Sequence, residues 1–140
     1  MNGYLLDTNV LSELRKGGRA DERVRKCVAG LPSDQLYLSV IVLAEIRKGI
    51  AGIRSRDPQQ AIHLETWRAR LESEYDFLGR LLTVDAEVAR AWGDLQGVRP
   101  VSIMDGFLAA TALVRDLTIV TRNESDFSGL GVGILNPFAS

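Results

Sequence analysis

The sequence is poor in the residues that build disulfides, zinc sites and histidine-based active sites. Its 140 residues include one cysteine, Cys27, and one histidine, His63. A single cysteine excludes an internal disulfide and a multi-cysteine zinc site, and a single histidine excludes acid–base catalysis by a pair of histidines. No apolar run approaches ~18 residues, and no basic stretch leads into an apolar one. We expect no transmembrane helix, no signal peptide and a cytoplasmic protein.

The sequence also lacks a large net charge. The formal charge is −1, so any binding of nucleic acid must use a local basic patch rather than the charge of the whole domain. Apolar residues make up 46% of the chain and charged residues 25%, which is ordinary for a globular protein. With this length, the composition predicts a single domain over residues 1–140.

Short apolar runs alternate with helical patterns along the whole chain. This alternation predicts an α/β domain with a mainly parallel sheet of about five strands flanked by helices. The first strand is apolar on both faces and should be central, whereas the last should lie at an edge. The predicted strands are Tyr4–Leu6, Leu36–Leu38, Leu81–Val84, Thr118–Thr121 and Val132–Leu135. The predicted helices cover about 8–16, 20–29, 40–53, 58–78, 86–97 and 103–117.

Four acidic residues occupy unusual positions in this pattern. Asp7 directly follows the first strand, and Glu45 lies in an apolar stretch after the second. Asp105 begins a helix that is apolar nearly all round, and Asp126 follows the strand Thr118–Thr121. Ligands of parallel sheets bind at the carboxyl ends of the strands, so we expect these carboxylates to gather there.

Each acid also has an ordinary structural explanation. These are a helix N-cap for Asp7, a pair with Lys48 for Glu45, a capping box with Ser102 for Asp105, and a turn carboxylate for Asp126. Together, however, four carboxylates would repel one another unless a cation lay between them. Oxygen ligands without histidine or cysteine suit Mg²⁺ or Mn²⁺, and such a site can assist phosphodiester cleavage.

Four segments, in this order and spacing, make the sequence resemble a known family. They are Leu6–Glu13, Ser39–Ile46, Asp105–Ala112 and Val120–Phe127, and the similarity continues to Leu135–Phe138. The sequence resembles the PIN-domain ribonucleases, and among them the VapC-like toxins of bacterial toxin–antitoxin pairs. One such segment would be weak support, but four in sequence are strong.

The resemblance implies a PIN-like three-layer domain with an acidic pocket for Mg²⁺ or Mn²⁺. It points to Asp7, Glu45 and Asp105 as the core acids. Asp126 is the fourth candidate, although Asn123 stands where some family members have an aspartate. The implied partners are an RNA substrate, expected to be a tRNA or rRNA, and a cognate antitoxin. Operator DNA is expected to be contacted only indirectly, through the antitoxin. No membrane partner is expected.

Other residues are predicted to support this site. Side chains that could orient the acids are Thr8, Asn9, Thr121 and Asn123, and cations near enough in sequence to contact RNA are Arg47, Lys48, Arg54 and Arg122. Each of these cations is equally explained as a solvated surface charge. Gly106 either leaves room for a metal or RNA, or allows close helix packing. The Leu64–Leu82 region is apolar enough to form a homodimer face.

Three other functions are alternatives to a ribonuclease, and the sequence departs from the patterns that the first two require. A phosphoacceptor receiver domain needs a lysine near the last strand, whereas the lysines here are Lys16, Lys26 and Lys48. An acid phosphatase-like hydrolase needs Asp-x-Asp after the first strand, but the third residue here is Asn9. An inactive binding module that represses its operon with a partner stays open. For the hydrolytic reaction we expect 5′-phosphate and 3′-hydroxyl ends, because no histidine pair is available to assist attack by a 2′-hydroxyl.

Overall fold

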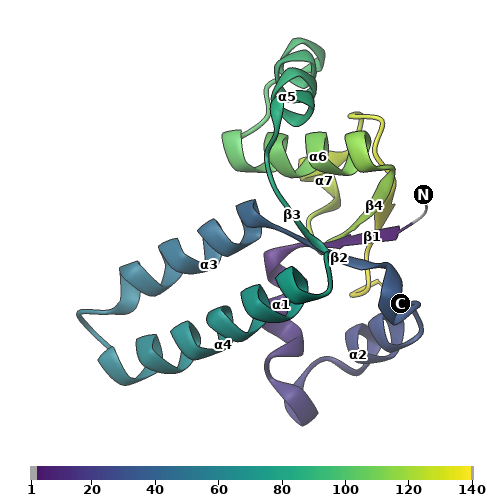
Figure 1. Cartoon of the computed structure of the whole chain (residues 1–140). Coiled ribbons are helices and arrows are strands. Elements are labelled where there is room, and N and C mark those ends of the chain that lie inside the picture. Colours follow the sequence, from purple (N-terminus) through teal and green to yellow (C-terminus); the bar gives the residue numbers. More distant parts are fainter. Residues whose placement is uncertain (1–2, 140) are drawn as a thin grey trace.

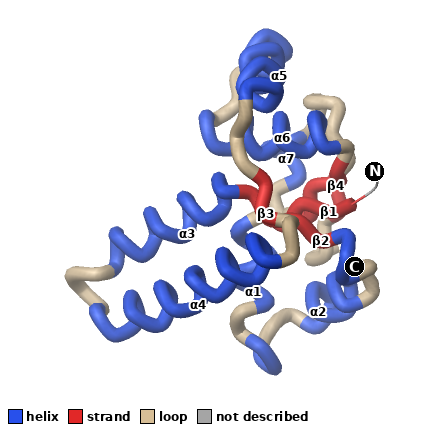
Figure 2. The backbone as a smooth tube through the Cα atoms, viewed as in Figure 1, coloured by secondary structure: helices blue, strands red, loops and turns tan. Residues whose placement is uncertain are grey.

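A computed structural model describes residues 3–139 and shows a five-stranded sheet in which every pairing is parallel. The strand order is β3-β2-β1-β4-β5. Figure 2 shows the strands, in red, gathered between the helices. The strands are β1 (Gly3–Leu6), β2 (Leu36–Ser39), β3 (Leu81–Leu82), β4 (Leu117–Val120) and β5 (Ile134–Leu135). The predicted parallel sheet is confirmed, with the first strand at its centre and the last at an edge.

The central strand is buried on both faces. Leu5 and Leu6 point to opposite faces and are both almost inaccessible to solvent. Gly3 packs so closely that a Cβ atom there would lie 2.8 Å from side-chain atoms of Leu117 and Tyr37. This packing explains why the strand is short and continuously apolar rather than alternating.

Helices cover both faces of the sheet (Figure 1). In this view α5 and α6 lie above the strands and α2 lies below them, while α3 and α4 form a long hairpin that extends to the left. The helices are α1 (Thr8–Leu14), α2 (Glu22–Ala29), α3 (Val40–Ile53), α4 (Pro58–Phe77), α5 (Ala86–Val98), α6 (Ile103–Arg115) and α7 (Glu124–Phe127). No single helix within residues 3–139 is long and apolar enough to cross a membrane, and only α5 and α6 taken together, bent by 117°, meet that length and composition.

Polar side chains at the ends of strands begin the helices that follow. Asp7 accepts a hydrogen bond from the Thr8 amide, and Ser39 accepts one from the amide of Ile41. Such caps satisfy amides that have no partner inside the helix. The N-cap explanation of Asp7 is therefore correct, but it uses only one of the two carboxylate oxygens.

The end of α6 differs from the prediction. The helix stops at Arg115 because Asp116 adopts a left-handed conformation, with φ 55° and ψ 53°. Strand β4 consequently begins and ends one residue earlier than predicted, and Thr121 lies just beyond it. The segment after β4 is also not a simple turn, because residues 124–127 form the short helix α7. This shift places Thr121 level with Asp7 at the edge of the sheet.

Gly106 is a packing residue. A Cβ atom there would lie 2.8 Å from Nε1 of Trp92 and 3.0 Å from Nε2 of Gln96, so α5 fills the space beside it. The Trp92 indole cannot move freely, since its N–H donates to the Ile103 carbonyl at 3.2 Å and its ring stacks on Phe107.

Replacing Gly106 with alanine is expected to destabilise the fold by about 1–3 kcal/mol through overpacking, despite the better helix propensity of alanine. The matched control is Gly93→Ala in α5, where nothing lies within 4 Å of the added methyl group. This control should be neutral or more stable by up to ~1 kcal/mol. Urea unfolding of the two variants measures both effects, and equal stability would show that α5 yields to the methyl group.

Candidate active site

Asp7 is held by three hydrogen-bond donors at the carboxyl end of β1. The Thr8 amide donates to Oδ1 at 2.8 Å, and the Thr121 hydroxyl donates to Oδ2 at 2.8 Å. The Asn9 side-chain amide adds a longer contact to Oδ2 at 3.3 Å. Only 7% of Asp7 is exposed, so its carboxylate is fixed in orientation and poorly solvated.

Asn9 and Thr121 also join the two chain segments that leave β1 and β4. Asn9 Nδ2 donates to Thr121 Oγ1 at 3.3 Å, and Asn9 Oδ1 accepts from the Arg122 amide at 3.0 Å. The hydroxyl of Thr121 accepts from the Asn123 amide at 3.1 Å. Asn123 therefore takes part through its main chain.

Glu45 lies in the second turn of α3 and contacts the same cluster. The Thr8 hydroxyl donates to Oε1 of Glu45 at 3.0 Å, while the Thr8 amide caps Asp7. Thr8 thus contacts two acids that are distant in the sequence, Asp7 before α1 and Glu45 in α3. The pairing with Lys48 suggested by the sequence is limited to an electrostatic attraction that slightly opposes the raised pKa of Glu45.

Asp105 lies in the first turn of α6, and its amide donates to the Ser102 hydroxyl at 3.3 Å. This contact is the N-cap half of the capping box that the sequence suggested. Asp126 lies in α7, which packs against α6. The negative charge of Asp126 is close enough to raise the pKa of Asp105.

Burial is the main cause of raised pKa values at three of the four acids. It raises the pKa of Asp7, although the hydrogen bond from Thr121 acts in the opposite direction. Burial likewise raises the pKa of Glu45 and of Asp105. Mutual repulsion adds to it, because Asp105 raises the pKa of Asp7 and both of these acids raise that of Glu45. The four acids are thus one electrostatic group, from Glu45 through Asp7 and Asp105 to Asp126.

The donor set of this group consists of carboxylate and hydroxyl oxygens, which fits Mg²⁺ or Mn²⁺. These carboxylates are also poorly solvated and repel one another, and a bound cation would relieve both effects. Within residues 3–139, however, no three His, Cys, Asp or Glu side chains are grouped closely enough to form a ready metal site. The side chains would have to draw together around an ion.

The predicted RNA-contacting cations lie in different surroundings. Arg47 forms an ion pair with Glu65 of α4 at 2.8 Å, and Arg54 lies at the turn between α3 and α4. The guanidinium of Arg122 stacks over the Phe138 ring at 4.8 Å from its centroid. Lys48 is the cation whose charge reaches Glu45. Arg122 is linked to the site through its main chain, because its amide donates to Asn9 Oδ1.

An apolar groove of 230 Å³ leads away from the acids between α1, α3 and α4. Thr8 and Glu45 lie at its acidic end, and Trp67 lies on its α4 side. The guanidinium of Arg15 lies over the Trp67 ring, 5.7 Å from the ring centroid. The remaining lining residues are Ser12, Ile46, Gly49, Ile50, Ile53 and Leu64. Sequence patterns did not indicate this groove, because its walls come from three separate helices.

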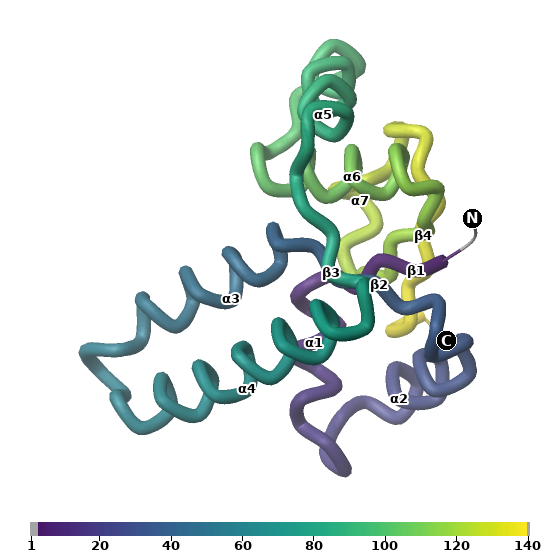
Figure 3. The backbone as a smooth tube through the Cα atoms, viewed as in Figure 1, coloured from purple at the N-terminus to yellow at the C-terminus, as the bar shows by residue number. Residues whose placement is uncertain are grey.

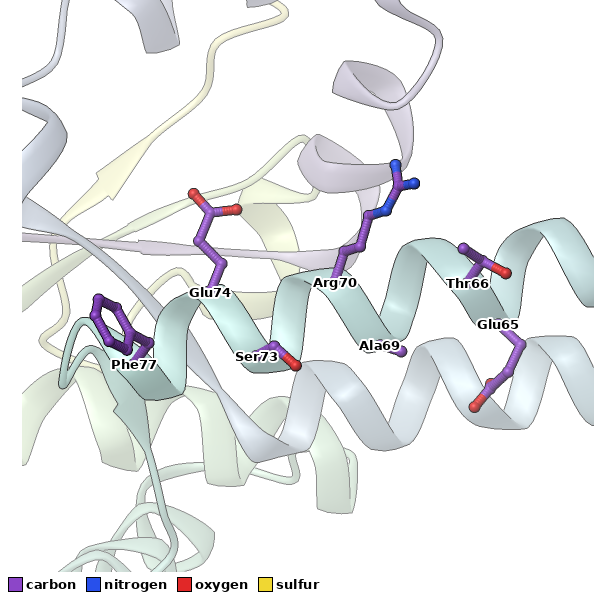
Figure 4. A pocket seen from close by; sticks show the side chains of 7 residues that line it. All are labelled: Glu65, Thr66, Ala69, Arg70, Ser73, Glu74 and Phe77. Carbon is purple, nitrogen blue, oxygen red and sulfur yellow. The ribbon is translucent and has the colours of Figure 1, made fainter.

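A second, shallower hollow lies on the outer surface of α4 (Figure 4). Its lining comes from α4 alone, and Phe77 at its end is 90% exposed. The other lining residues are Glu65, Thr66, Ala69, Arg70, Ser73 and Glu74. None of the four acids lines it, so it is a surface feature rather than part of the acidic site.

Residues 4–132 match the family model described as PIN domain. The chain belongs to the PIN domain family. It is 33% identical to the VapC ribonuclease Y4jK of Sinorhizobium fredii over 96% of each chain. It is 32% identical to toxin FitB of Neisseria gonorrhoeae, over 96% of this chain and 97% of FitB. The solved structure of FitAcB from Neisseria gonorrhoeae superposes on this PIN domain with a TM-score of 0.79, covering 98% of this chain and 99% of that chain at 32% identity. The predicted PIN fold and the resemblance to VapC-like toxins are confirmed.

Proposed function

We propose that this PIN domain is a Mg²⁺- or Mn²⁺-dependent endoribonuclease, the toxin of a toxin–antitoxin pair, acting in the cytoplasm. The observation that carries the proposal is the group of partly buried acids with raised pKa values at the carboxyl edge of the sheet. Stable folding does not require such a group, since each carboxylate would be better solvated elsewhere. Relatives named ribonuclease and toxin support the proposed activity.

The chain's own residues have distinct tasks in this reaction. Asp7, Glu45, Asp105 and Asp126 would hold the ion, which when bound offsets phosphate charge and acidifies water. Thr121 and Asn9 fix the carboxylate of Asp7, and Thr8 orients Glu45. Without the ion these acids repel an RNA phosphate, so the substrate binds only when their charge is offset. In the proposed reaction water attacks phosphorus and the bond to the 3′-oxygen breaks, which leaves 5′-phosphate and 3′-hydroxyl ends.

The partner proposed is a cognate antitoxin that covers the apolar groove beside Glu45. Solved structures similar to this chain include FitAB bound to a DNA fragment, with a TM-score of 0.71 and 29% identity over 98% of this chain and 96% of that chain. An apolar segment of an antitoxin would bury Trp67 and Leu64 and lie across the entrance to the acids. Operator DNA would then be contacted through the antitoxin.

An inactive module that only represses its operon is the second candidate. It would need the groove and the antitoxin but not the acids. The bonds that Asn9 and Thr121 donate to Asp7 would then serve no function, because the Thr8 amide alone makes the cap contact. The experiment that separates the two incubates purified protein with tRNA and rRNA in Mn²⁺ or in chelator, and sequences the RNA ends. New 5′-phosphate ends that depend on metal support the nuclease, and uncut RNA supports the inactive module.

The outer face of α4 is proposed as a homodimer interface. Ile62 and Phe77 lie near its two ends and are 65% and 90% exposed, with the small residues Ala69 and Ser73 between them. If two copies packed antiparallel about a twofold axis near Ala69, Phe77 of each copy would meet Ile62 of the partner subunit. The Ala69 side chains allow the close approach that such packing requires.

Phe77→Ser is therefore expected to shift the protein from dimer to monomer, because each interface would lose two large apolar side chains. The matched control is Val98→Ser, which removes a 60% exposed apolar side chain from the end of α5 instead. Sedimentation equilibrium over a concentration series measures the association. A wild-type monomer, or a Phe77→Ser dimer of unchanged affinity, would rule out this face.

A further inference from the structure

Arg99, between α5 and α6, makes a set of contacts that the sequence patterns did not single out. Its guanidinium donates through Nη2 to the carbonyls of Ser125, Asp126 and Ser128, at 3.3, 3.0 and 3.0 Å. Nε donates a further bond to the Ser128 carbonyl at 3.2 Å, and Nη1 donates to that of Pro100 at 3.1 Å. Every one of these acceptors is a main-chain carbonyl, so Arg99 holds the backbone of the segment around Asp126.

These contacts lie at the C-terminal end of α7. A helix of four residues is too short to be stable by itself, and the carbonyls at its end have no partners within the helix. Arg99 supplies donors and a positive charge at that end. At the other end, Asn136 Nδ2 donates to Glu124 Oε2 at 2.9 Å. The helix that carries Asp126 is thus fastened at both ends. Figure 3 shows the backbone of this helix, α7, beside α6.

The charge of Arg99 also reaches the acidic site. It partly opposes the raised pKa of Asp105, whereas Asp126 adds to that rise. The same guanidinium therefore fixes the segment that carries one acid and partly offsets the repulsion felt by another. This arrangement lets two carboxylates remain close together before any cation arrives.

We propose that Arg99 is a positioning residue of the acidic site, which fixes α7 so that Asp126 stays beside Asp105. The inference rests on the proposed metal-dependent nuclease, and it assigns Arg99 no contact with RNA or metal. It predicts that Arg99 acts through Asp126. A lysine should not replace it, because one ammonium group cannot satisfy carbonyls arranged around a planar fork.

The test compares Arg99→Gln and Arg99→Lys with the wild type by Mn²⁺ titration calorimetry and by RNA cleavage. Both variants are expected to bind Mn²⁺ about 10-fold more weakly and to lose activity in proportion, which is typical for groups that orient metal ligands. The matched control is Arg80→Gln, since Arg80 also donates to a main-chain carbonyl, that of Leu36, at the opposite edge of the sheet. This control should bind Mn²⁺ as the wild type does.

A double-mutant cycle decides whether Arg99 acts through Asp126. In an Asp126→Asn background, Arg99→Gln should weaken Mn²⁺ binding little further, whereas equal losses in both backgrounds would overturn the proposal. Amide hydrogen exchange of residues 124–130 should be faster in Arg99→Gln, and unchanged exchange would also overturn it. A wild type that neither binds Mn²⁺ nor cuts RNA would refute the nuclease instead, and the exchange result would then decide on Arg99 alone.

Discussion

Replacing Asp7 with asparagine is expected to lower metal-dependent RNA cleavage by about 100-fold or more. Such a loss corresponds to roughly 2.7 kcal/mol of transition-state stabilisation, the size expected when a site loses a charged ligand. Asp7 should be the most sensitive of the four acids, because it is the most buried and has the most hydrogen-bond donors. Cleavage of a labelled RNA in Mn²⁺ measures the effect.

The fold should survive this substitution. Asparagine is as good a helix N-cap as aspartate, so the contact with the Thr8 amide is kept. Asparagine would lose the bond from the Thr121 hydroxyl, whose oxygen already accepts bonds from Asn9 and from the Asn123 amide. Removal of a poorly solvated charge offsets this loss. The Asp7→Asn protein should therefore unfold at nearly the wild-type urea concentration, and full activity in a preparation free of host nuclease would remove Asp7 from the site.

Adding Mn²⁺ at about 100 times its Kd is expected to raise the wild-type melting temperature by roughly 10 °C. Mass action gives about 2.7 kcal/mol at that excess, and a domain of this size gains ~4 °C per kcal/mol. Asp105→Asn should behave differently in two respects. It should melt above the wild type in chelator, because one of the repelling carboxylates is gone, and it should respond little to Mn²⁺.

The direction of the first effect follows from the raised pKa of Asp105. A folded-state pKa above the ordinary value means that the folded protein binds the proton more tightly, so ionisation near neutral pH costs stability. Asparagine removes that cost and keeps the main-chain contact with Ser102. If Asp105 were only a capping residue, its substitution would cost about 0.5–1 kcal/mol and leave the metal response intact. An equal Mn²⁺ shift in both proteins would exclude Asp105 from the site.

The general plan of this fold could be read from the sequence because it depends on local chemistry. Apolar runs such as Tyr4–Leu6 specify strands, and Asp7 and Ser39 mark where helices begin. Errors arose where a single backbone conformation decides the outcome. The left-handed Asp116 ends α6 early, and the segment after β4, expected as a turn, forms the helix α7 with its carbonyls bound by Arg99.

The site could be predicted less fully than the fold. The four acids share a position relative to strands, and parallel topology brings such positions to one edge. Contacts between distant side chains leave no periodic signal, so neither the Thr8–Glu45 hydrogen bond nor the Arg99 contacts could be foreseen in detail. The role of Gly106 was undecided for the same reason, since only the packed structure shows Trp92 against it.

The order of segments in the sheet has a consequence for protein synthesis. The Asp7 carboxylate near the start of the chain acquires its Thr121 partner only when β4 pairs with β1, and α7 follows β4. The proposed acidic site therefore cannot assemble during translation until residues beyond 126 have been added to the chain. Fragments that end just before β4 would contain Asp7, Glu45 and Asp105, but they would lack both Thr121 and Asp126. The complete set of acids is therefore present only in chains that have reached the end of α7.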